Sequence, residues 1–203
     1  MLFRSFSLAL FQAEGFNYSM RWLHFFFGIM WIGHLYYFNF TQGSFFAETD
    51  ATTKSNAIQK LLPRALWWFR WASVATLATG LIIAGVVPDY MKNFLNHTSP
   101  DDYGLNAGNA AIGVGMILGI TMAANVWMVI WKNQKVVIAN ATNVLGGGEA
   151  DPNAAGAGRR ALLASRQNLI FSVSMLFYMV GAAHFYETVF TDRKSTRLNS
   201  SHT

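Results

Sequence analysis

The chain has 203 residues, of which 53% are hydrophobic and 12% are charged. Soluble domains of this size carry about a quarter charged residues, so the composition predicts a protein whose surface faces lipid as well as water. There is no cysteine, which excludes disulfides, thiolate metal ligands and cysteine nucleophiles. The net charge of +5 comes from basic residues that flank apolar segments, a pattern that indicates membrane topology and argues against a nucleic-acid partner.

Residues 1–17 carry only a short apolar stretch that Gln12 and Glu14 interrupt, so we expect an interfacial segment and not a cleavable signal peptide. The chain then holds four segments with the about 20 apolar residues that a helix needs to cross a bilayer. Their approximate bounds are 18–40, 65–87, 109–131 and 162–190. The sequence therefore predicts an all-α fold, an integral membrane four-helix bundle over residues 18–191.

Polar connections separate these segments. We expect residues 41–64 to form a loop with a short helix around residues 55–62, and residues 132–161 to form a flexible, glycine- and alanine-rich linker. Residues 192–203, apart from the last, match the in-frame translation of a widely used DNA sequencing adaptor. We interpret them as an artefact of sequence assembly and exclude them from the fold.

Lysine and arginine near the helix ends predict the orientation of the bundle. The second connection holds only Lys92, whereas the first and third connections and their borders are basic: Lys54, Lys60, Arg64 and Arg70, then Lys132, Lys135, Arg159, Arg160 and Arg166. We expect these two connections on the cytoplasmic side of a bacterial inner membrane, with both termini in the periplasm. Tryptophans favour such boundaries, and five lie at this one: Trp67, Trp68, Trp71, Trp127 and Trp131.

The third segment contains two further packing signals. Gly115 and Gly119 form a small-xxx-small pattern, which lets a second helix approach closely. Asn125 is a polar residue inside an apolar segment, and we expect it to form a hydrogen bond to another helix.

Ionisable residues inside a membrane segment are costly, so each one is a functional hypothesis. Three histidines qualify: His24 and His34 in the first segment and His184 in the last. His24 and His184 each lie about 9 Å from the outer end of their helix, so antiparallel helices would bring them to the same depth. His34 lies about 15 Å deeper than His24 and faces another side of the helix, which makes it a weaker ligand candidate.

Two histidines at one depth of a helical bundle are what bis-imidazole haem ligation requires. We therefore expect His24 and His184 to bind the iron of a haem, of b-type because no Cys-x-x-Cys-His attachment motif is present. Gly28 and Gly181 would leave room for the macrocycle beside the two histidines. Trp31 would form an apolar wall, and Arg21 would pair with a propionate.

Two alternatives use the same histidines differently. Each histidine could instead pack inside the bundle with hydrogen bonds of its own. A dinuclear copper or zinc site would need three or more clustered ligands, and the sequence offers neither cysteine nor suitable acidic partners.

Several motifs, which are spread over most of residues 18–188, resemble a known family. They are Arg-Trp-Leu-His (21–24), Gly-Ile-Met-Trp-Ile-Gly (28–33), Tyr-Tyr-Phe (36–38), Trp-Trp-Phe-Arg-Trp (67–71), Thr-Gly (79–80), Gly-Ile-Thr-Met-Ala-Ala-Asn-Val (119–126), Gln-Lys (134–135), Arg-Gln-Asn (166–168) and Ala-His-Phe (183–185). In this order they resemble helices of the bacterial membrane-bound urate oxidase (urate hydroxylase) family.

The resemblance implies urate oxidation coupled to the respiratory chain, in the inner membrane, and a role in purine catabolism. His24 and His184 fall on histidine positions of the family, whereas Gly113 and Gln167 replace family histidines and His34 stands where a small residue is usual. The family's membrane domain is longer and is followed by a c-type cytochrome domain. This sequence therefore resembles a compact version without that domain.

Three functions follow as hypotheses. The first is a b-type haem protein that transfers electrons to a cytochrome c or another respiratory carrier, as a component of an oxidoreductase. The second is a non-catalytic membrane subunit or small-solute permease without haem, for which a homo-oligomer could build the path. The third is direct urate oxidation with a cytochrome c partner.

Overall fold

The structure is a computed structural model that describes residues 13–86 and 103–184. Most of these residues are helical and none forms a strand, which confirms the all-α prediction. Most of the expected N-terminal segment, the second connection, the end of the fourth segment and the tail 192–203 lie outside the described residues. The elements in chain order are α2 (Ala13–Tyr36), η1 (Tyr37–Gln42), α3 (Gly43–Glu48), α4 (Ala51–Lys60), α5 (Leu62–Val86), α7 (Tyr103–Ala124), η3 (Asn125–Ile130), α8 (Trp131–Leu145) and α9 (Ala154–His184).

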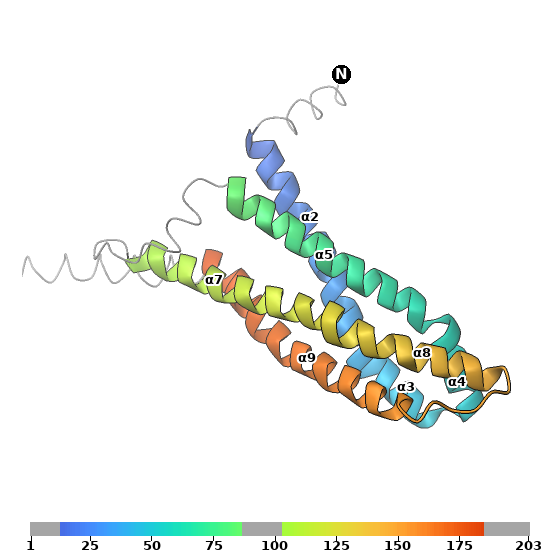
Figure 1. Ribbon diagram of the computed structural model, residues 1–203. Coiled ribbons are helices and arrows are strands. Elements are labelled where there is room, and N and C mark those ends of the chain that lie inside the picture. Colours follow the sequence, from blue (N-terminus) through green and yellow to red (C-terminus); the bar gives the residue numbers. More distant parts are fainter. Residues whose placement is uncertain (1–12, 87–102, 185–203) are drawn as a thin grey trace, which may run out of the picture.

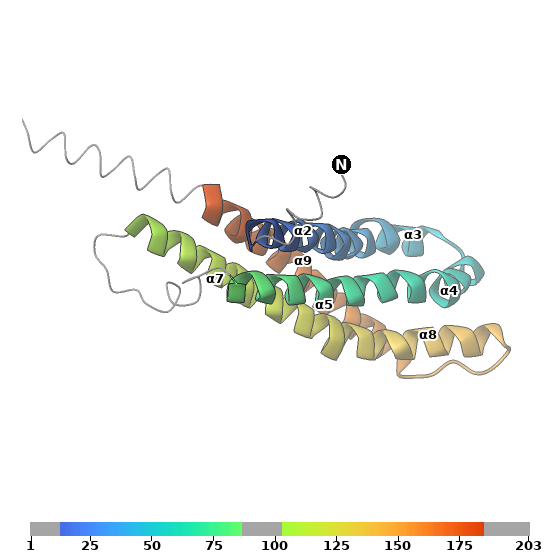
Figure 2. The ribbon, with the colours of Figure 1, turned by 90° about the horizontal axis from the view of Figure 1, so that it is seen from above.

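The long helices lie side by side in two main pairs (Figures 1 and 2). α2 packs mainly along α5, and α7 packs mainly along α9, while α8 contacts both α9 and α4. The described residues form four long rods, which in chain order are α2–η1–α3, α5, α7–η3–α8 and α9. Buried side chains from the two pairs meet in one core, represented by Trp31 and Leu35 of α2, Phe69 of α5, and Met122 and Val126 of the third rod.

The first and third predicted helices are longer than expected at their C-terminal ends, where they extend into the predicted connections. The rod that starts with α2 continues through η1 and α3 to Glu48, and the rod that starts with α7 continues through η3 and α8 to Leu145. α4 starts before the short helix expected at 55–62, because Asp50 caps it by accepting hydrogen bonds from the main-chain N–H groups of Thr52 and Thr53, at 2.9 and 3.0 Å. Hydrogen bonds from Thr53 also hold the pKa of Asp50 below its usual value.

The prediction of a flexible linker over residues 132–161 is wrong for most of this range, because α8 and the start of α9 occupy it. Its small residues form a close helix contact instead of a flexible chain. Ala157 and Ala161 are almost fully buried, and a Cβ added at Gly158 would lie 3.6 Å from Val137 of α8. Only residues 146–153 connect the two helices, and Gly147 turns the chain with a φ of 84°.

The Gly115 and Gly119 pattern is used as expected for close approach, and the partner is α9. A Cβ added at Gly115 would lie 3.0 Å from Cγ of Met179, and one added at Gly119 would lie 3.5 Å from Sδ of Met175. Two methionine side chains therefore pack onto the two glycines, one turn apart, and the flexible thioethers fill the space that the missing side chains leave.

A row of buried polar residues on α9 faces the other helices: Ser165, Asn168 and Ser172. Asn168, with no exposed surface, accepts a hydrogen bond from Nδ2 of Asn125 at 3.0 Å and donates to the carbonyl of Met122 at 2.9 Å. This confirms the interhelical bond expected of Asn125. Nδ2 of Asn39 donates to the Ser165 hydroxyl at 2.8 Å, so the same face of α9 holds the first rod as well.

The two asparagines that bond to the polar row of α9 lie in π-helical turns: Asn39 in η1 and Asn125 at the start of η3. A π turn shifts the main-chain hydrogen bonds from i−4 to i−5, as the bond from the Trp131 N–H to the Val126 carbonyl shows. The wider turns lie where the rods meet the polar row of α9, and the Met122 carbonyl just before η3 accepts the Asn168 side chain.

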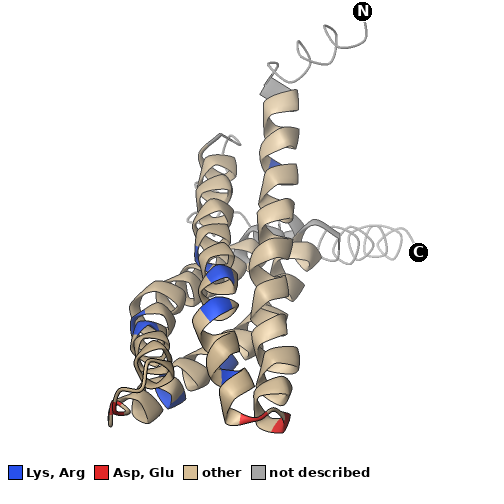
Figure 3. Ribbon diagram, turned by 90° about the vertical axis from the view of Figure 1, so that its right-hand side faces the viewer, with Lys and Arg blue, Asp and Glu red and all other residues tan. Residues whose placement is uncertain are grey.

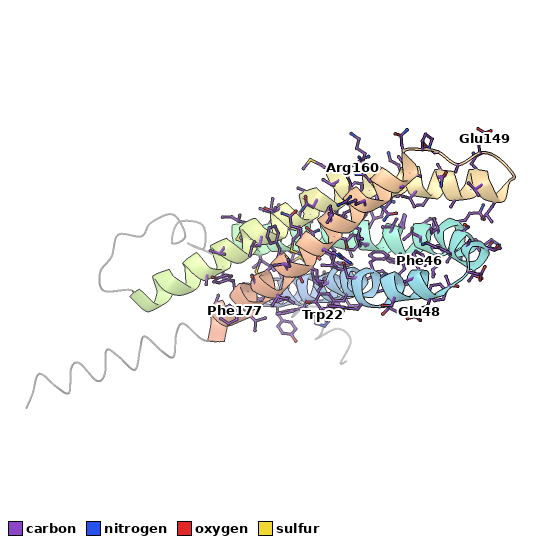
Figure 4. The ribbon with its side chains drawn as sticks, turned by 90° about the horizontal axis from the view of Figure 1, so that it is seen from below. Trp22, Phe46, Glu48, Glu149, Arg160 and Phe177 are labelled. Atoms are coloured by element: carbon purple, nitrogen blue, oxygen red, sulfur yellow. The ribbon has the colours of Figure 1, made fainter. Side chains whose placement is uncertain are left out.

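Charged and apolar surfaces separate along the bundle. Apart from Arg21, the described lysines and arginines gather toward the end formed by α3, α4, α8 and the start of α9 (Figure 3). Figure 4 shows Glu48 and Glu149 at this end and the exposed apolar side chains Trp22 and Phe177 toward the other. Two helical stretches, Leu62–Gly85 and Ala111–Leu145, are long and apolar enough to cross a membrane, by length and composition.

The glycine contacts predict different effects of one substitution at two positions. Gly119→Ala should raise stability by up to about 1 kcal/mol, because alanine favours a helix over glycine by that amount and its Cβ would meet Met175 at an ordinary distance. Gly115→Ala should lose this gain, because its Cβ would lie 3.0 Å from Met179. Thermal unfolding of both variants in the same detergent, followed by circular dichroism, measures the difference. A higher Tm for Gly115→Ala than for Gly119→Ala would contradict the contact.

The polar row on α9 predicts a second effect. Asn168→Ala should destabilise the bundle by about 1–3 kcal/mol, because it leaves the Met122 carbonyl and the Asn125 amide buried without their partner. Ser174→Ala, on the exposed face of the same helix, is the matched control. Equal unfolding midpoints for the two variants would show that the hydrogen bonds of Asn168 do not hold α9 in place.

Candidate functional site

A cavity of about 440 Å³ lies where α2, α5, α7 and α9 come together. Most of its wall is apolar and includes Ile32 of α2, Leu77 of α5, Met116 of α7 and Met175 of α9. Its polar side chains are few: Arg21, His24, Tyr36 and Thr76. Its size is in the range of small-molecule sites, and such sites are usually apolar with a few polar groups that orient the ligand.

His24 is the imidazole on this wall, and α5 holds it. Its Nδ1 lies 2.9 Å from the main-chain carbonyl of Thr76 and 3.2 Å from the hydroxyl of Thr79. Because a carbonyl only accepts, Nδ1 is the nitrogen that carries the proton in this bond. In the neutral ring Nε2 then has the free lone pair, and no hydrogen bond to Nε2 occurs among the described residues. Histidines that bind metals are usually oriented in this way, with the N–H of the other ring nitrogen donating to a carbonyl or carboxylate.

Two glycines shape the space around this ring. A Cβ added at Gly80 of α5 would lie 3.1 Å from Cε1 and 3.4 Å from Nδ1 of His24, so the imidazole is seated against a position that only glycine leaves open. A Cβ added at Gly28, one turn after His24, would meet no atom within 4 Å. The ring is thus fixed on one side and has free space on another.

The residues predicted from the sequence meet at this cavity only in part. Arg21, His24, Gly28 and Trp31 all line it. Arg21 is exposed, and its Nε donates to Asn17 at 2.9 Å. Trp31 is almost fully buried, and its indole N–H has no partner in the described part of the chain.

The other predicted residues are placed differently. Gly181 does not line the cavity, although Met179 and Val180 of the same helix do. His34 is also absent from the wall, and its Nδ1 lies 2.7 Å from the carbonyl of Met30 on its own helix. His184 is the last residue of α9, and its side chain lies outside the described residues, so the expected pairing with His24 stays a prediction.

Sequence reasoning missed the α5 residues that position His24, namely Thr76, Thr79 and Gly80. Thr79-Gly80 already belongs to one of the family-like motifs, which was the available signal. Thr76 and Thr79 also donate their hydroxyl protons to carbonyls of their own helix, at 2.8 Å each, which fixes both side chains. Among the described residues, no group of three or more His, Cys, Asp or Glu side chains could hold a metal ion.

Residues 102–197 match the family described as urate oxidase N-terminal. The match starts before α7, spans α8 and α9, and ends inside the segment 192–203 that we interpreted as adaptor-derived. Comparison with curated proteins and with solved structures finds no further match. The order of motifs along the chain agrees with this match, which assigns residues 102–197 to the urate oxidase N-terminal family.

Proposed function

We propose that the chain is a membrane domain whose four long helices hold a b-type haem on His24, and that it passes electrons to a respiratory carrier such as a cytochrome c. The observation that carries this proposal is the orientation of His24 at the wall of an apolar cavity, with Nδ1 bonded to the Thr76 carbonyl and Nε2 free. The family description connects the domain to urate oxidation, which we propose as the source of the electrons.

The outer surface supports placement in a membrane. Large apolar side chains are exposed on each of the four rods, for example Ile29 at 72%, Met128 at 67% and Ile170 at 69%. Monomeric soluble proteins rarely expose apolar surface over such an extent, and two of the helical stretches have the length and composition of membrane spans. We propose that all four rods cross the inner membrane, with the lysine- and arginine-rich end in the cytoplasm and both termini in the periplasm.

The donor set at the cavity suits a haem. Haem iron takes imidazole nitrogen as an axial ligand, and His24 offers Nε2 from a fixed ring. When bound, a haem would supply one-electron redox chemistry through its iron. The chain's own residues would orient the ligand, exclude water with the apolar walls of α7 and α9, and place the exposed Arg21 where it can pair with an anionic substituent.

α9 could supply a second residue to hold the haem. His184 lies on this helix just past the residues that line the cavity, and it remains our proposed ligand opposite His24. His34, whose Nδ1 is engaged on its own helix away from the cavity, is the weaker candidate.

The cavity is less suited to urate itself. Urate presents carbonyl and N–H groups around its whole edge, and each would need a partner when it is taken out of water. Few polar side chains of the described residues line the wall. Nδ1 of His24 is already bonded to the main-chain carbonyl of Thr76, and the Thr76 hydroxyl donates to its own helix, so of these two residues only Nε2 of His24 is left for a ligand. We therefore propose electron transfer through this cavity, with urate chemistry at another site or in a partner.

The proposal predicts a spectrum that depends on His24. The protein purified from membranes, or reconstituted with haem, should show a Soret band that shifts on reduction. His24→Ala should reduce bound haem to background, because it removes the oriented axial nitrogen. The measurement is the absorption spectrum of oxidised and reduced protein, with haem content per chain.

His34→Ala is the matched control, because it removes an imidazole from the same helix without touching the cavity wall. It should leave haem content unchanged. Wild-type protein that binds no haem, or a His24→Ala variant with a wild-type spectrum, would refute the proposal.

The seat of His24 against α5 gives an independent prediction. Gly80→Ala should displace the ring, since its Cβ would lie 3.1 Å from Cε1 of His24, and should therefore lower haem occupancy and broaden the Soret band. Gly85→Ala on the same helix, where a Cβ would meet nothing within 4 Å, should behave as wild type. Haem titrations of the two variants, with helix content checked by circular dichroism, decide the matter; equal haem affinities would contradict the proposed seat.

A further inference from the structure

A second group of polar and aromatic residues lies away from the cavity, where α5 meets η3 and α8. We define it by its members and call it the Arg70 cluster: Arg70, Lys135, Trp71, Trp127 and Trp131. The haem proposal makes no use of it. Its geometry points to a binding site for an anionic group.

Two cations share one indole in this cluster. The guanidinium carbon of Arg70 lies 3.5 Å from the centroid of the Trp131 ring and 5.3 Å from that of Trp127. Nζ of Lys135 lies 5.8 Å from the same Trp131 ring. Stacking on an aromatic face holds a guanidinium in a fixed plane, so the donors of Arg70 are held ready for a planar partner.

These cations have no anionic partner in the described part of the chain. Nε of Arg70 donates to the carbonyl of Leu66 at 3.2 Å, which leaves its terminal N–H groups for another acceptor. The carboxylates whose side chains the structure describes are Glu48, Asp50, Glu149 and Asp151, and none forms an ion pair with Arg70 or Lys135. Two cations brought together without a carboxylate favour a bound anion, because like charges otherwise repel.

The surroundings favour a lipid as the source of this anion. Trp71 packs edge to face against Trp127, with ring centroids 5.7 Å apart, and continues into the exposed Trp67 and Trp68. These three tryptophans of α5 are each about half exposed, at 47–50%. Arg70 lies about 12 Å along α5 from its first residue, inside the stretch Leu62–Gly85 that has the composition of a membrane span. Tryptophan belts mark the level of the lipid headgroups.

We propose that the Arg70 cluster binds the headgroup phosphate of an anionic phospholipid, with the acyl chains along the exposed tryptophans of α5. The guanidinium of Arg70 takes the phosphate oxygens by paired hydrogen bonds, and Lys135 adds a second charge. The inference rests on the membrane placement in the proposed function, but not on haem.

The test uses full-length protein in nanodiscs of phosphatidylcholine that contain graded amounts of phosphatidylglycerol. Lipid retained by the protein is measured by native mass spectrometry after mild detergent release. Wild type should retain phosphatidylglycerol in preference to phosphatidylcholine. Arg70→Gln and Lys135→Gln should each weaken this preference by about fivefold, the effect of one basic residue at the membrane surface.

Lys132→Gln is the matched control, because it removes an equally basic, exposed residue of α8 whose ammonium is not among the cations over the Trp131 ring in the described part of the chain. It should leave the preference within about twofold of wild type, less than the effect of one engaged charge. Lys135→Gln also covers the case in which Arg70→Gln does not fold, since Lys135 is exposed. An equal effect of all three variants would show general charge attraction and overturn the site.

A further arm separates the lipid from free phosphate. Excess inorganic phosphate should not displace phosphatidylglycerol, and displacement would overturn the lipid as the occupant. Protein that does not enter nanodiscs would refute the membrane placement itself. Protein that enters them and binds haem, but shows no lipid preference, would overturn this inference alone.

Discussion

The fold depends on one buried polar contact, the pair of hydrogen bonds that Asn168 of α9 forms with the Asn125 side chain and the Met122 carbonyl. A buried amide is costly unless it is paired, so this contact fixes the position of α9 along the axis of the rod α7–η3–α8. Met175 and Met179 follow about two and three turns later on the same helix and then lie against Gly119 and Gly115. The position of α9 in turn closes one wall of the cavity, which connects this contact to the site.

On the opposite wall the constraint is the bond from Nδ1 of His24 to the Thr76 carbonyl. It joins α2 to α5 and decides which nitrogen of the imidazole carries the proton. Gly80 lets the two helices approach closely, because a Cβ at this position would lie 3.1 Å from Cε1 of His24 and the ring would have to shift. The polar contact of α9 therefore fixes one wall of the cavity, while the second contact orients His24 with Nδ1 on the Thr76 carbonyl and Nε2 free. Together they account for an oriented imidazole in otherwise apolar surroundings.

The sequence predicted the helical class, the approximate extent of α5, the bond from Asn125 and the close approach at Gly115 and Gly119, because each depends on local pattern or on one costly polar residue. It failed at 132–161, where small residues suggested a linker although Ala157 and Ala161 pack α9 against α8. It gathered four of the cavity residues but not Thr76 and Gly80, since no local pattern reveals a contact between residues of different helices. The pairing of His24 with His184 stays a prediction that rests on helix depth and on the family resemblance at both positions.

The central claim is that Nε2 of His24 binds haem iron. Electron paramagnetic resonance of the oxidised, haem-loaded protein tests it most directly, with histidine labelled at the ring nitrogens with ¹⁵N. The account predicts a low-spin ferric signal with hyperfine coupling to a histidine nitrogen, and loss of this signal in His24→Ala but not in His34→Ala. A signal without histidine coupling, or one that His24→Ala leaves unchanged, would contradict it.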